Sequence, residues 1–414
     1  MPNLDQDLDA ARDDLLRQIQ IPELAAVRAR ATSISRRRRG LAAGGAALAC
    51  LVVLGTGTVL LGDAVRGPDR GQPVASDSGP AGQYWRGGGL TMLGLNGTVL
   101  DQPGDLRDIQ FADSQHGYAL SAQCDRDLTR PCPLAMASTT DGGRTWIDWS
   151  LPVAEAPADR LPSIVAVGAD GLVLVGDTVW FGHRGAGWQQ RSVDTKATVS
   201  AVPVGGRLAL VSDDLGYATP TVAVWTVDGS LARLTVQPEM AVYWVASAPA
   251  ADGAWWVGGT LGGAPAVGVS RDAGRTWKLT PLSGATSDAW AQVSTLGSDV
   301  YATVVSPRGG DPGVLTIHTV YRSGAGGPFT PYANLIGTLV GDVVPLLDGR
   351  LVAAGPNWYV NAGRDSALKP AGGSMPWVGR VERTTGGWIA YDLFQAGWAA
   401  ISRDGETWQK INVH

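Results

Sequence analysis

The chain has 414 residues, of which 44% are hydrophobic and 17% charged, with 56 glycines and 16 tryptophans. A mean hydropathy of +0.02 with abundant tryptophan excludes a disordered chain, which buries too little apolar surface to offset its ordering entropy. The glycines have no three-residue period, so collagen is also excluded. The formal net charge of −5 argues against a nucleic-acid-binding protein, which presents a basic surface to phosphates.

The first part of the chain is polar and then abruptly apolar. Residues 1–40 contain eight arginines and six acidic residues, and their leucines and isoleucine at helical spacing predict a short amphipathic helix. Residues 41–62 are uncharged and would span about 33 Å as a helix, enough for the core of a bilayer. Because four arginines directly precede this span, we expect the N-terminus in the cytoplasm and the rest of the chain outside, as a single-pass membrane protein.

Two other interpretations of this segment stay open. A cleaved signal peptide would remove it, and a lipoprotein signal would end at Cys50. Residues 63–83 are rich in Gly, Pro, Ser and Asp and predict a flexible linker. The remaining residues, 84–414, are then an extracytoplasmic domain.

This predicted domain contains two cysteines, Cys124 and Cys132, separated by seven residues. In an oxidising exterior such a pair favours a disulfide that closes a small loop. A metal site is the alternative, but no second pair of metal-binding side chains lies nearby, and the histidines are scattered singly at His116, His183, His318 and His414. We therefore expect neither a metal nor another cofactor.

A short motif recurs three times at nearly equal spacing. It reads TTDGGRTW at 139–146, SRDAGRTW at 270–277 and SRDGETW at 402–408, and its aspartates are 131 and 132 residues apart. Equal spacing of this kind indicates a repeat architecture.

Seven units of about 44 residues, each with four short apolar runs, can be traced between Arg107 and Val413. This is the size of a four-stranded blade, and we predict an all-β, seven-bladed β-propeller. The third unit begins with TVSAVP at 198–203 and the sixth with LIGTLVGDVVPLL at 335–347. Two β-sandwich domains are the alternative fold.

We expect the recurring motif to be a structural turn between the third and fourth strands of a blade. Its aspartate accepts hydrogen bonds from turn amides, its glycine adopts a positive φ, and its tryptophan holds the last strand. Three equivalent catalytic sites round one ring would be unusual chemistry, so no catalytic residue is predicted here. The predicted turn residues are Thr139, Asp141, Gly143, Trp146, Ser270, Asp272, Gly274, Trp277, Ser402, Asp404 and Trp408.

These stretches resemble the Asp-box (BNR) repeats of sialidase-like propellers, and residues 108–146 are similar to the photosystem II assembly factor type of propeller. The resemblance implies the fold but no single activity, because such propellers include hydrolases, adhesins and assembly factors. For a sialidase it would imply an arginine triad, an aspartic acid/base, and a tyrosine nucleophile paired with a glutamate. The candidates are Glu239 near Tyr243, Glu382 near Tyr391, and the arginines Arg160, Arg350 and Arg380.

The sequence favours a membrane-anchored, extracytoplasmic and non-catalytic propeller, monomeric in its ectodomain, that binds a protein or glycan of the cell envelope. A sialidase-like exo-glycosidase is the first alternative. A transmembrane regulator, whose tail relays an external signal to a cytosolic partner, is the second.

Overall fold

A computed structural model of the protein describes residues 84–413 apart from 101, 126–129, 169, 177, 192–196, 212–219, 284–287, 309–310, 340–342, 355–356, 385–386 and 393–397. The predicted tail (1–40), membrane span (41–62) and linker (63–83) lie outside these residues. Within the described part of the chain, no helix is both long and apolar enough to cross a lipid bilayer.

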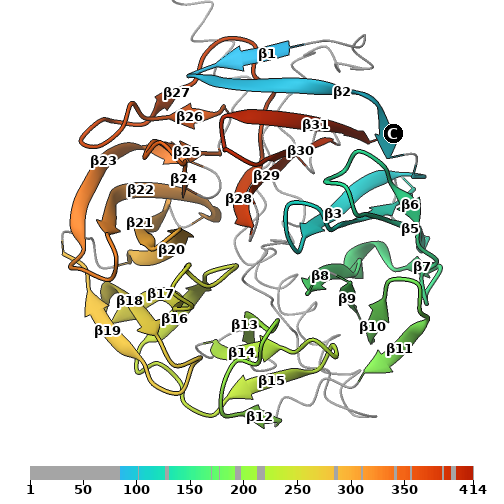
Figure 1. Cartoon of the computed structure of the whole chain (residues 1–414), viewed down its shortest axis with the longest axis horizontal. Helices are drawn as coiled ribbons and strands as arrows, with labels where there is room; N and C mark the ends of the chain where they lie inside the picture. The colour runs from blue at the N-terminus through green and yellow to red at the C-terminus, as the bar shows by residue number, and fades with distance from the viewer. Residues whose placement is uncertain are drawn as a thin grey trace, which may run out of the picture. The chain divides into compact units, whose positions relative to one another are not determined.

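The described strands form seven sheets, which are arranged as blades around a common axis (Figure 1). The predicted all-β, seven-bladed propeller with four-stranded blades is therefore confirmed. In the second blade, β8 to β11 are short runs that pair antiparallel across tight turns.

The described residues of the first three blades contain one short 3-10 helix and thirteen strands. The first blade comprises β3 (Asp105–Phe111), β4 (Gly117–Ala122), β5 (Cys132–Thr139) and β6 (Ile147–Asp148), with β7 (Glu155–Ala156) paired to β5. The helix η1 (Ala158–Arg160) leads to the second blade, with β8 (Ser163–Val167), β9 (Gly171–Val175), β10 (Val179–His183) and β11 (Trp188–Arg191). The third comprises β12 (Thr198–Val199), β13 (Arg207–Val211), β14 (Thr221–Trp225) and β15 (Leu231–Leu234).

The remaining strands form the other four blades. The fourth comprises β16 (Ala241–Val245), β17 (Trp255–Leu261), β18 (Ala264–Ser270) and β19 (Lys278–Pro281). The fifth comprises β20 (Trp290–Leu296), β21 (Asp299–Arg308), β22 (Asp311–Ser323) and β23 (Thr330–Leu339). The sixth comprises β24 (Val343–Pro345), β25 (Leu351–Ala353), β26 (Tyr359–Val360) and β27 (Lys369–Pro370). The seventh comprises β28 (Arg380–Thr384), β29 (Gly387–Asp392), β30 (Trp398–Ser402) and β31 (Thr407–Val413).

The hydrophobic core is divided into layers between neighbouring blades. Each of seven clusters of buried side chains joins two adjacent blades, and one of them joins the seventh blade to the first. Both faces of a blade are thus buried, which explains why strands such as β4 and β9 are buried at every position. Buried strands of this kind carry continuous apolar runs in place of alternating ones.

The N-terminal hairpin closes the ring in a way that the sequence did not reveal. Strand β1 (Tyr84–Gly87) pairs with β2 (Leu90–Leu100), and β2 pairs in parallel with β31 at the outer edge of the seventh blade. Residues Leu90 and Met92 are buried in the core between the sixth and seventh blades. The hairpin therefore belongs to the folded ring, and Figure 1 shows it outside the last strand of the chain.

The third blade differs from the prediction. The predicted first run, TVSAVP, does not form its innermost strand, because β12 lies at the outer edge and pairs in parallel with β15. The residues that follow form a turn in which the Gly206 amide donates to the Pro203 carbonyl at 2.9 Å. Since proline has no amide hydrogen for a ladder, this segment cannot continue as a regular strand. The innermost strand is β13.

The boundary between the fifth and sixth blades also differs from the prediction. Residues 335–339, expected in the sixth unit, extend β23 of the fifth blade. They do so because β22 is 13 residues long and offers a partner, with Leu315 opposite Leu339 and Ile317 opposite Gly337. The sixth blade starts only at β24.

Candidate functional site

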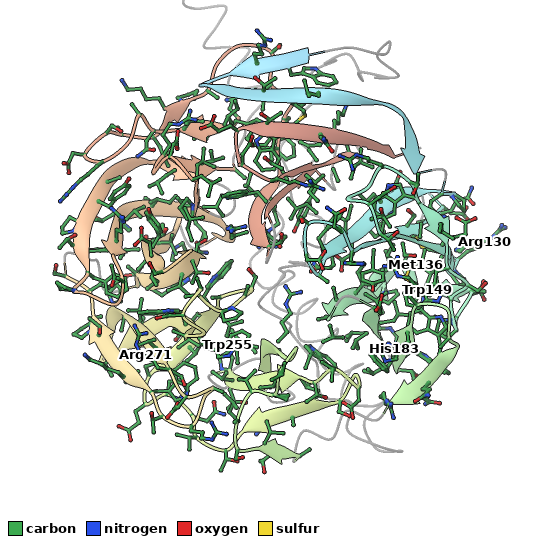
Figure 2. The ribbon with its side chains drawn as sticks, in the orientation of Figure 1. Arg130, Met136, Trp149, His183, Trp255 and Arg271 are labelled. Carbon is green, nitrogen blue, oxygen red and sulfur yellow. A yellow bond between two sulfur atoms is a disulfide. The ribbon has the colours of Figure 1, made fainter. Side chains whose placement is uncertain are left out.

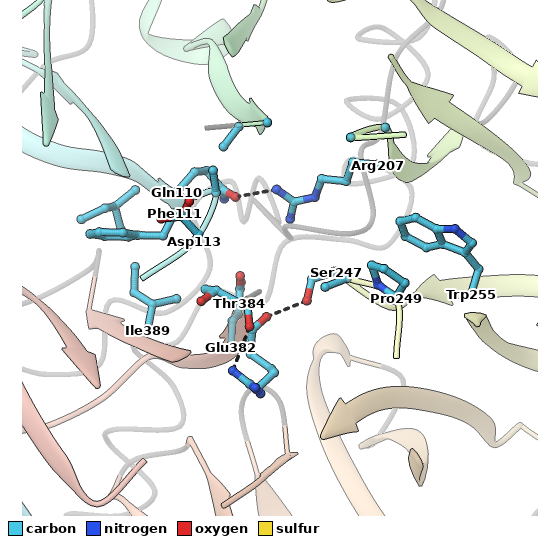
Figure 3. A pocket seen from close by; sticks show the side chains of 18 residues that line it. Gln110, Phe111, Asp113, Arg207, Ser247, Pro249, Trp255, Glu382, Thr384 and Ile389 are labelled. Atoms are coloured by element: carbon cyan, nitrogen blue, oxygen red, sulfur yellow. Dashed lines mark hydrogen bonds between the residues drawn. The ribbon is translucent and has the colours of Figure 1, made fainter. Parts of the chain in front are cut away.

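A cavity of about 350 Å³ with both polar and apolar walls lies on the axis of the ring, where several innermost strands end. Its wall comes from the ends of β3, β8, β16 and β28 and the start of β13 (Figure 3). The polar side chains in this wall include Gln110, Arg207, Ser247, Glu382 and Thr384. This volume is near the lower end of the range for small-molecule sites.

Two hydrogen bonds cross the channel beside this cavity. Arg207 of the third blade donates from a terminal guanidinium nitrogen to the Gln110 side-chain oxygen of the first blade at 3.3 Å. The Ser247 hydroxyl of the fourth blade donates to the backbone carbonyl of Arg383 in the seventh blade at 2.6 Å. Figure 3 shows the first contact as a dashed line between Gln110 and Arg207.

A buried carboxylate lies behind Gln110. Asp108, which is 5% exposed, accepts a hydrogen bond from the Ile164 amide at 2.9 Å and a longer one from Gln110 at 3.4 Å. Burial raises the pKa of Asp108 to about 6, although these hydrogen bonds act in the opposite direction. Burial also lowers the pKa of Arg207, while the nearby carboxylates of Glu382 and Asp108 raise it.

The glutamate and tyrosine of one predicted pair do meet. The Tyr391 hydroxyl donates to Glu382 Oε1 at 2.6 Å, and Arg380 Nε lies 3.5 Å from the same oxygen. Tyr391 is only 4% exposed and is not among the residues that line the cavity. Burial raises the pKa of this phenol well above its ordinary value, and the Glu382 charge acts in the same direction. The hydroxyl is therefore protonated, and it is buried behind Glu382 and does not line the cavity.

The end of β28 adds a cation to the wall. One terminal nitrogen of Arg383 donates to the carbonyls of Thr384 and Gly387, and the guanidinium lies 4.2 Å from the centre of the Trp388 ring. Burial lowers the pKa of Arg383, but an arginine remains charged. Arg383 Nε and the Thr384 hydroxyl are buried without a hydrogen-bond partner among the described residues. No carboxylate in the described part of the chain forms an ion pair with Arg383.

The three recurring Asp turns share one hydrogen-bond pattern. In the first, the Thr139 hydroxyl donates to Asp141 Oδ1 at 2.8 Å, and the Thr145 hydroxyl donates to Oδ2 at 2.7 Å. Ser270 and Thr276 donate to Asp272 in the same way, at 2.8 and 2.6 Å. In the third, one residue shorter, the Thr407 amide donates to Asp404 at 2.7 Å. These aspartates organise their own turns and do not line the cavity.

The glycines of these turns also hold neighbouring blades together. Gly143, Gly274 and Gly405 have φ values of +82°, +90° and +80°. A Cβ at these positions would lie 2.6, 2.9 and 2.5 Å from Ile411, Leu234 and Leu346, each in the preceding blade. The tryptophans pack in the same layers, most deeply Trp408, which is fully buried against Trp358; Trp146 and Trp277 are partly buried.

The other sialidase candidates do not gather in the cavity. Tyr243 packs edge-on against Trp290, with ring centres 6.2 Å apart. Arg350 pairs with Asp348 and Glu406 in the sixth and seventh blades. Arg160 lies on η1 between the first and second blades. Only Arg380 is close to the Tyr391–Glu382 pair.

A disulfide joins Cys124 to Cys132 at the start of β5. Arg130, from the loop that this disulfide closes, lies at the outer edge of the first blade (Figure 2). No group of three or more His, Cys, Asp or Glu side chains within the described ranges is arranged to hold a metal ion.

Arg207, Asp108 and Gln110 were not selected from the sequence, although one signal was available. Each interrupts an apolar run that the repeat places on an inner strand, in RLALVS and RDIQFA. A charged side chain in a buried strand needs a charged or hydrogen-bonding partner, or a cavity that holds water, because burying an unpaired charge costs free energy. The sequence alone could not show that these runs converge.

Comparisons with known proteins identify no family. No family model matches the sequence, and no curated protein matches it. Among solved structures, YCF48 bound to a D1 peptide has a TM-score of 0.38 and 11% identity over 75% of this chain and 92% of that one. YCF48 from Cyanidioschyzon merolae has a TM-score of 0.39 and 14% identity over 80% and 99%. The GH74 xyloglucanase from Xanthomonas campestris has 0.40 and 14% over 78% of this chain and 64% of its own.

No functional residue is carried over from these proteins, because the similarities are low. The class that the fold and the site define is a seven-bladed β-propeller with a cavity on its axis.

Proposed function

We propose that this protein is a membrane-anchored, extracytoplasmic binding propeller that holds a protein or glycan of the cell envelope at its central cavity. The observation that carries the proposal is the composition of the cavity wall: Arg207, Ser247, Glu382 and Thr384 face it, whereas Tyr391 is buried outside it. A ligand can therefore meet polar side chains from several blades without meeting the Tyr391 hydroxyl. The membrane anchor is the segment 41–62, and the three Asp turns are Asp-box repeats of the ring.

The hydrolase alternative has one observation in its favour, the 2.6 Å contact between Tyr391 and Glu382 with Arg380 nearby. A sialidase-like reaction needs that hydroxyl beside the substrate, since the nucleophile must reach the bond that it breaks. The burial of Tyr391 and the engagement of Arg383 with backbone carbonyls speak against this chemistry. The regulator alternative depends on residues 1–40, which lie outside the described residues.

The experiment is affinity capture from envelope extracts with the full-length protein in detergent. Pro249 is exposed and lines the cavity, so Pro249→Trp places a bulky side chain at the opening without disturbing the core. We expect this variant to lose the captured partner, and Arg364→Gln, at an exposed arginine outside the cavity wall, to retain it. Equal capture by all three proteins would contradict binding at the cavity. A fluorogenic sialoside incubated in parallel should show no turnover above a Tyr391→Phe control.

A further inference from the structure

The side chain of Gln110 connects a buried carboxylate to an arginine of the cavity wall. Its amide nitrogen donates to Asp108 Oδ1 at 3.4 Å, and its amide oxygen accepts from Arg207 at 3.3 Å (Figure 3). Gln110 is only 3% exposed, so its amide has little solvent to turn towards. The end of the amide that faces Arg207 is therefore determined by what Asp108 requires at the other end.

The observed orientation is the one that an ionised Asp108 requires. A carboxylate only accepts hydrogen bonds, so it faces the NH₂ end of Gln110 and leaves the oxygen end for Arg207. Asp108 Oδ2 accepts a hydrogen bond from the Ile164 amide at 2.9 Å, so an added proton belongs on Oδ1, the oxygen that faces Gln110. Protonated Oδ1 is a donor and needs the oxygen end of Gln110. Arg207 would then face an NH₂ group, which cannot accept its hydrogen bond.

A second acceptor for Arg207 lies in the same cavity wall. Arg207 and Glu382 both line the cavity, and the Glu382 charge is near enough to act on the pKa of Arg207. Within the described part of the chain, the two do not form an ion pair, and Arg207 donates only to Gln110. Tyr391 and Arg380 both contact Glu382 Oε1, and no described residue donates to Oε2. An ion pair between Arg207 and Glu382 would cross the cavity.

Asp108 can take up a proton under mildly acidic conditions. Burial, with a smaller effect of the Glu382 charge, raises the pKa of Asp108 to about 6. The other groups with charges or protons to exchange near Asp108 are Arg207 of β13 and Tyr391 of β29, and β8 faces it with the Ile164 amide. Arginine stays charged, and burial holds the pKa of Tyr391 well above its ordinary value. Protonation of Asp108 therefore removes one of two carboxylate charges beside an unchanged cation.

We infer that Asp108, Gln110 and Arg207 form a proton-controlled switch that closes the axial cavity by moving Arg207 from Gln110 to Glu382. While Asp108 is ionised, Arg207 is held to the first blade and the cavity is open. When Asp108 is protonated, Gln110 reverses its amide, and Arg207 pairs with Glu382 across the cavity. This inference rests on the proposed function and specifies how binding at the same cavity is regulated.

Nuclear magnetic resonance of the full-length protein in detergent tests the switch itself. The side chains of glutamine and arginine are labelled with ¹⁵N, and the two signals are assigned by their loss in Gln110→Leu and Arg207→Lys. We expect both signals to shift together with a midpoint near pH 6 in the wild type, and neither to shift in Asp108→Asn. A Gln110 signal that does not titrate, or an Arg207 signal that stays fixed while the Gln110 signal titrates, would overturn the inference.

Two further variants control this measurement. Asp105→Asn removes an exposed carboxylate from the same strand as Asp108 and should titrate as the wild type does. In Glu382→Gln the Gln110 signal should still titrate, but the Arg207 signal should shift less, because a neutral amide attracts a guanidinium less than a carboxylate does. An unchanged Arg207 shift would show that Glu382 is not the second acceptor.

Capture from envelope extracts tests the effect on binding. The apparent affinity is proportional to the fraction of the protein with an open cavity, so for a pKa of about 6 we expect binding about fourfold weaker at pH 5.5 than at pH 7.5. Asp108→Asn imitates the protonated state, since its amide donates to Gln110, and should bind weakly at both pH values. Equal capture by the wild type at both pH values, or wild-type capture by Asp108→Asn at pH 7.5, would contradict this regulation.

The two experiments separate the switch from the proposed function. If capture is lost in Pro249→Trp but neither signal titrates, the switch is wrong and the proposed function survives. If both signals titrate together but capture is insensitive to Pro249→Trp at both pH values, the proposed function is wrong and the switch survives.

Discussion

Two aspartates of the ring have pKa values that are displaced in opposite directions. Burial raises the pKa of Asp108 to about 6, whereas the hydrogen bonds from the Thr276 hydroxyl, the Thr276 amide and Ser270 lower the pKa of Asp272 to about 2. Asp108 is buried behind Gln110 and desolvated, whereas Asp272 is a partly buried residue of a turn whose hydroxyl and amide groups donate hydrogen bonds to its carboxylate. The same residue type thus has opposite effects on the pH dependence of stability.

For Asp108 we predict that stability increases as the pH falls. Its folded pKa is above the unfolded value, so the native state binds a proton more tightly between about pH 6 and pH 4. Between pH 7 and pH 5 the wild type should gain about 1 kcal/mol relative to Asp108→Asn, measured by denaturant unfolding of the full-length protein. A parallel pH profile for the two proteins would show that Asp108 titrates normally.

For Asp272 we predict the reverse. Its folded pKa is below the unfolded value, so its contribution is complete above about pH 4 and is lost as the pH falls towards 2. Asp272→Asn should therefore unfold at a lower temperature than the wild type at pH 6, and the difference should narrow at pH 2.5. The readout is the midpoint of thermal unfolding at each pH. A difference that stays constant would rule out a role for the ionised carboxylate.

At the scale of strands and turns, the features that could be predicted from the sequence are those that depend on residues close together in the chain. Apolar runs, glycine turns and the recurring motif at Asp141, Asp272 and Asp404 can be read from neighbouring residues. Seven blades form as expected, apart from the first strand of the third blade and the boundary between the fifth and sixth. Two pairings could not be predicted in this way: β2 pairs in parallel with β31, and β12 pairs in parallel with β15. No local sequence pattern indicates which distant segments will pair. The turn at Pro203 explains the difference in the third blade, and the length of β22 explains the shifted boundary between the fifth and sixth blades.

The closing hairpin gives a prediction at this scale. Met92 of β2 is fully buried between the sixth and seventh blades. Met92→Ala should cost about 2–4 kcal/mol of unfolding free energy, as large-to-small changes in a packed core do. Ile147→Ala, at a residue that is 66% exposed on an outer strand, should cost less than about 0.5 kcal/mol. Similar small losses for both variants would mean that the hairpin is not part of the core.

At the scale of the whole molecule, the ring brings together residues that are far apart in sequence. Gln110 and Arg207 are 97 residues apart, and Ser247 and Arg383 are 136 apart, yet each pair forms a hydrogen bond across the channel. The sequence placed Glu382 near Tyr391, and the two lie on adjacent strands and form a hydrogen bond. It could not show that Tyr391 is buried and does not line the cavity. The wall of the site is a property of the closed ring.

The central claim is that a partner binds at the axial cavity, and photo-cross-linking tests it most directly. A photoreactive amino acid is placed at Pro249, exposed in the cavity wall, and in a second protein at Ile147, exposed on the outer strand β6. After irradiation in native membranes, we predict a specific adduct from position 249 and none from position 147. An adduct formed from position 147 alone, or from neither position, would contradict binding at the cavity.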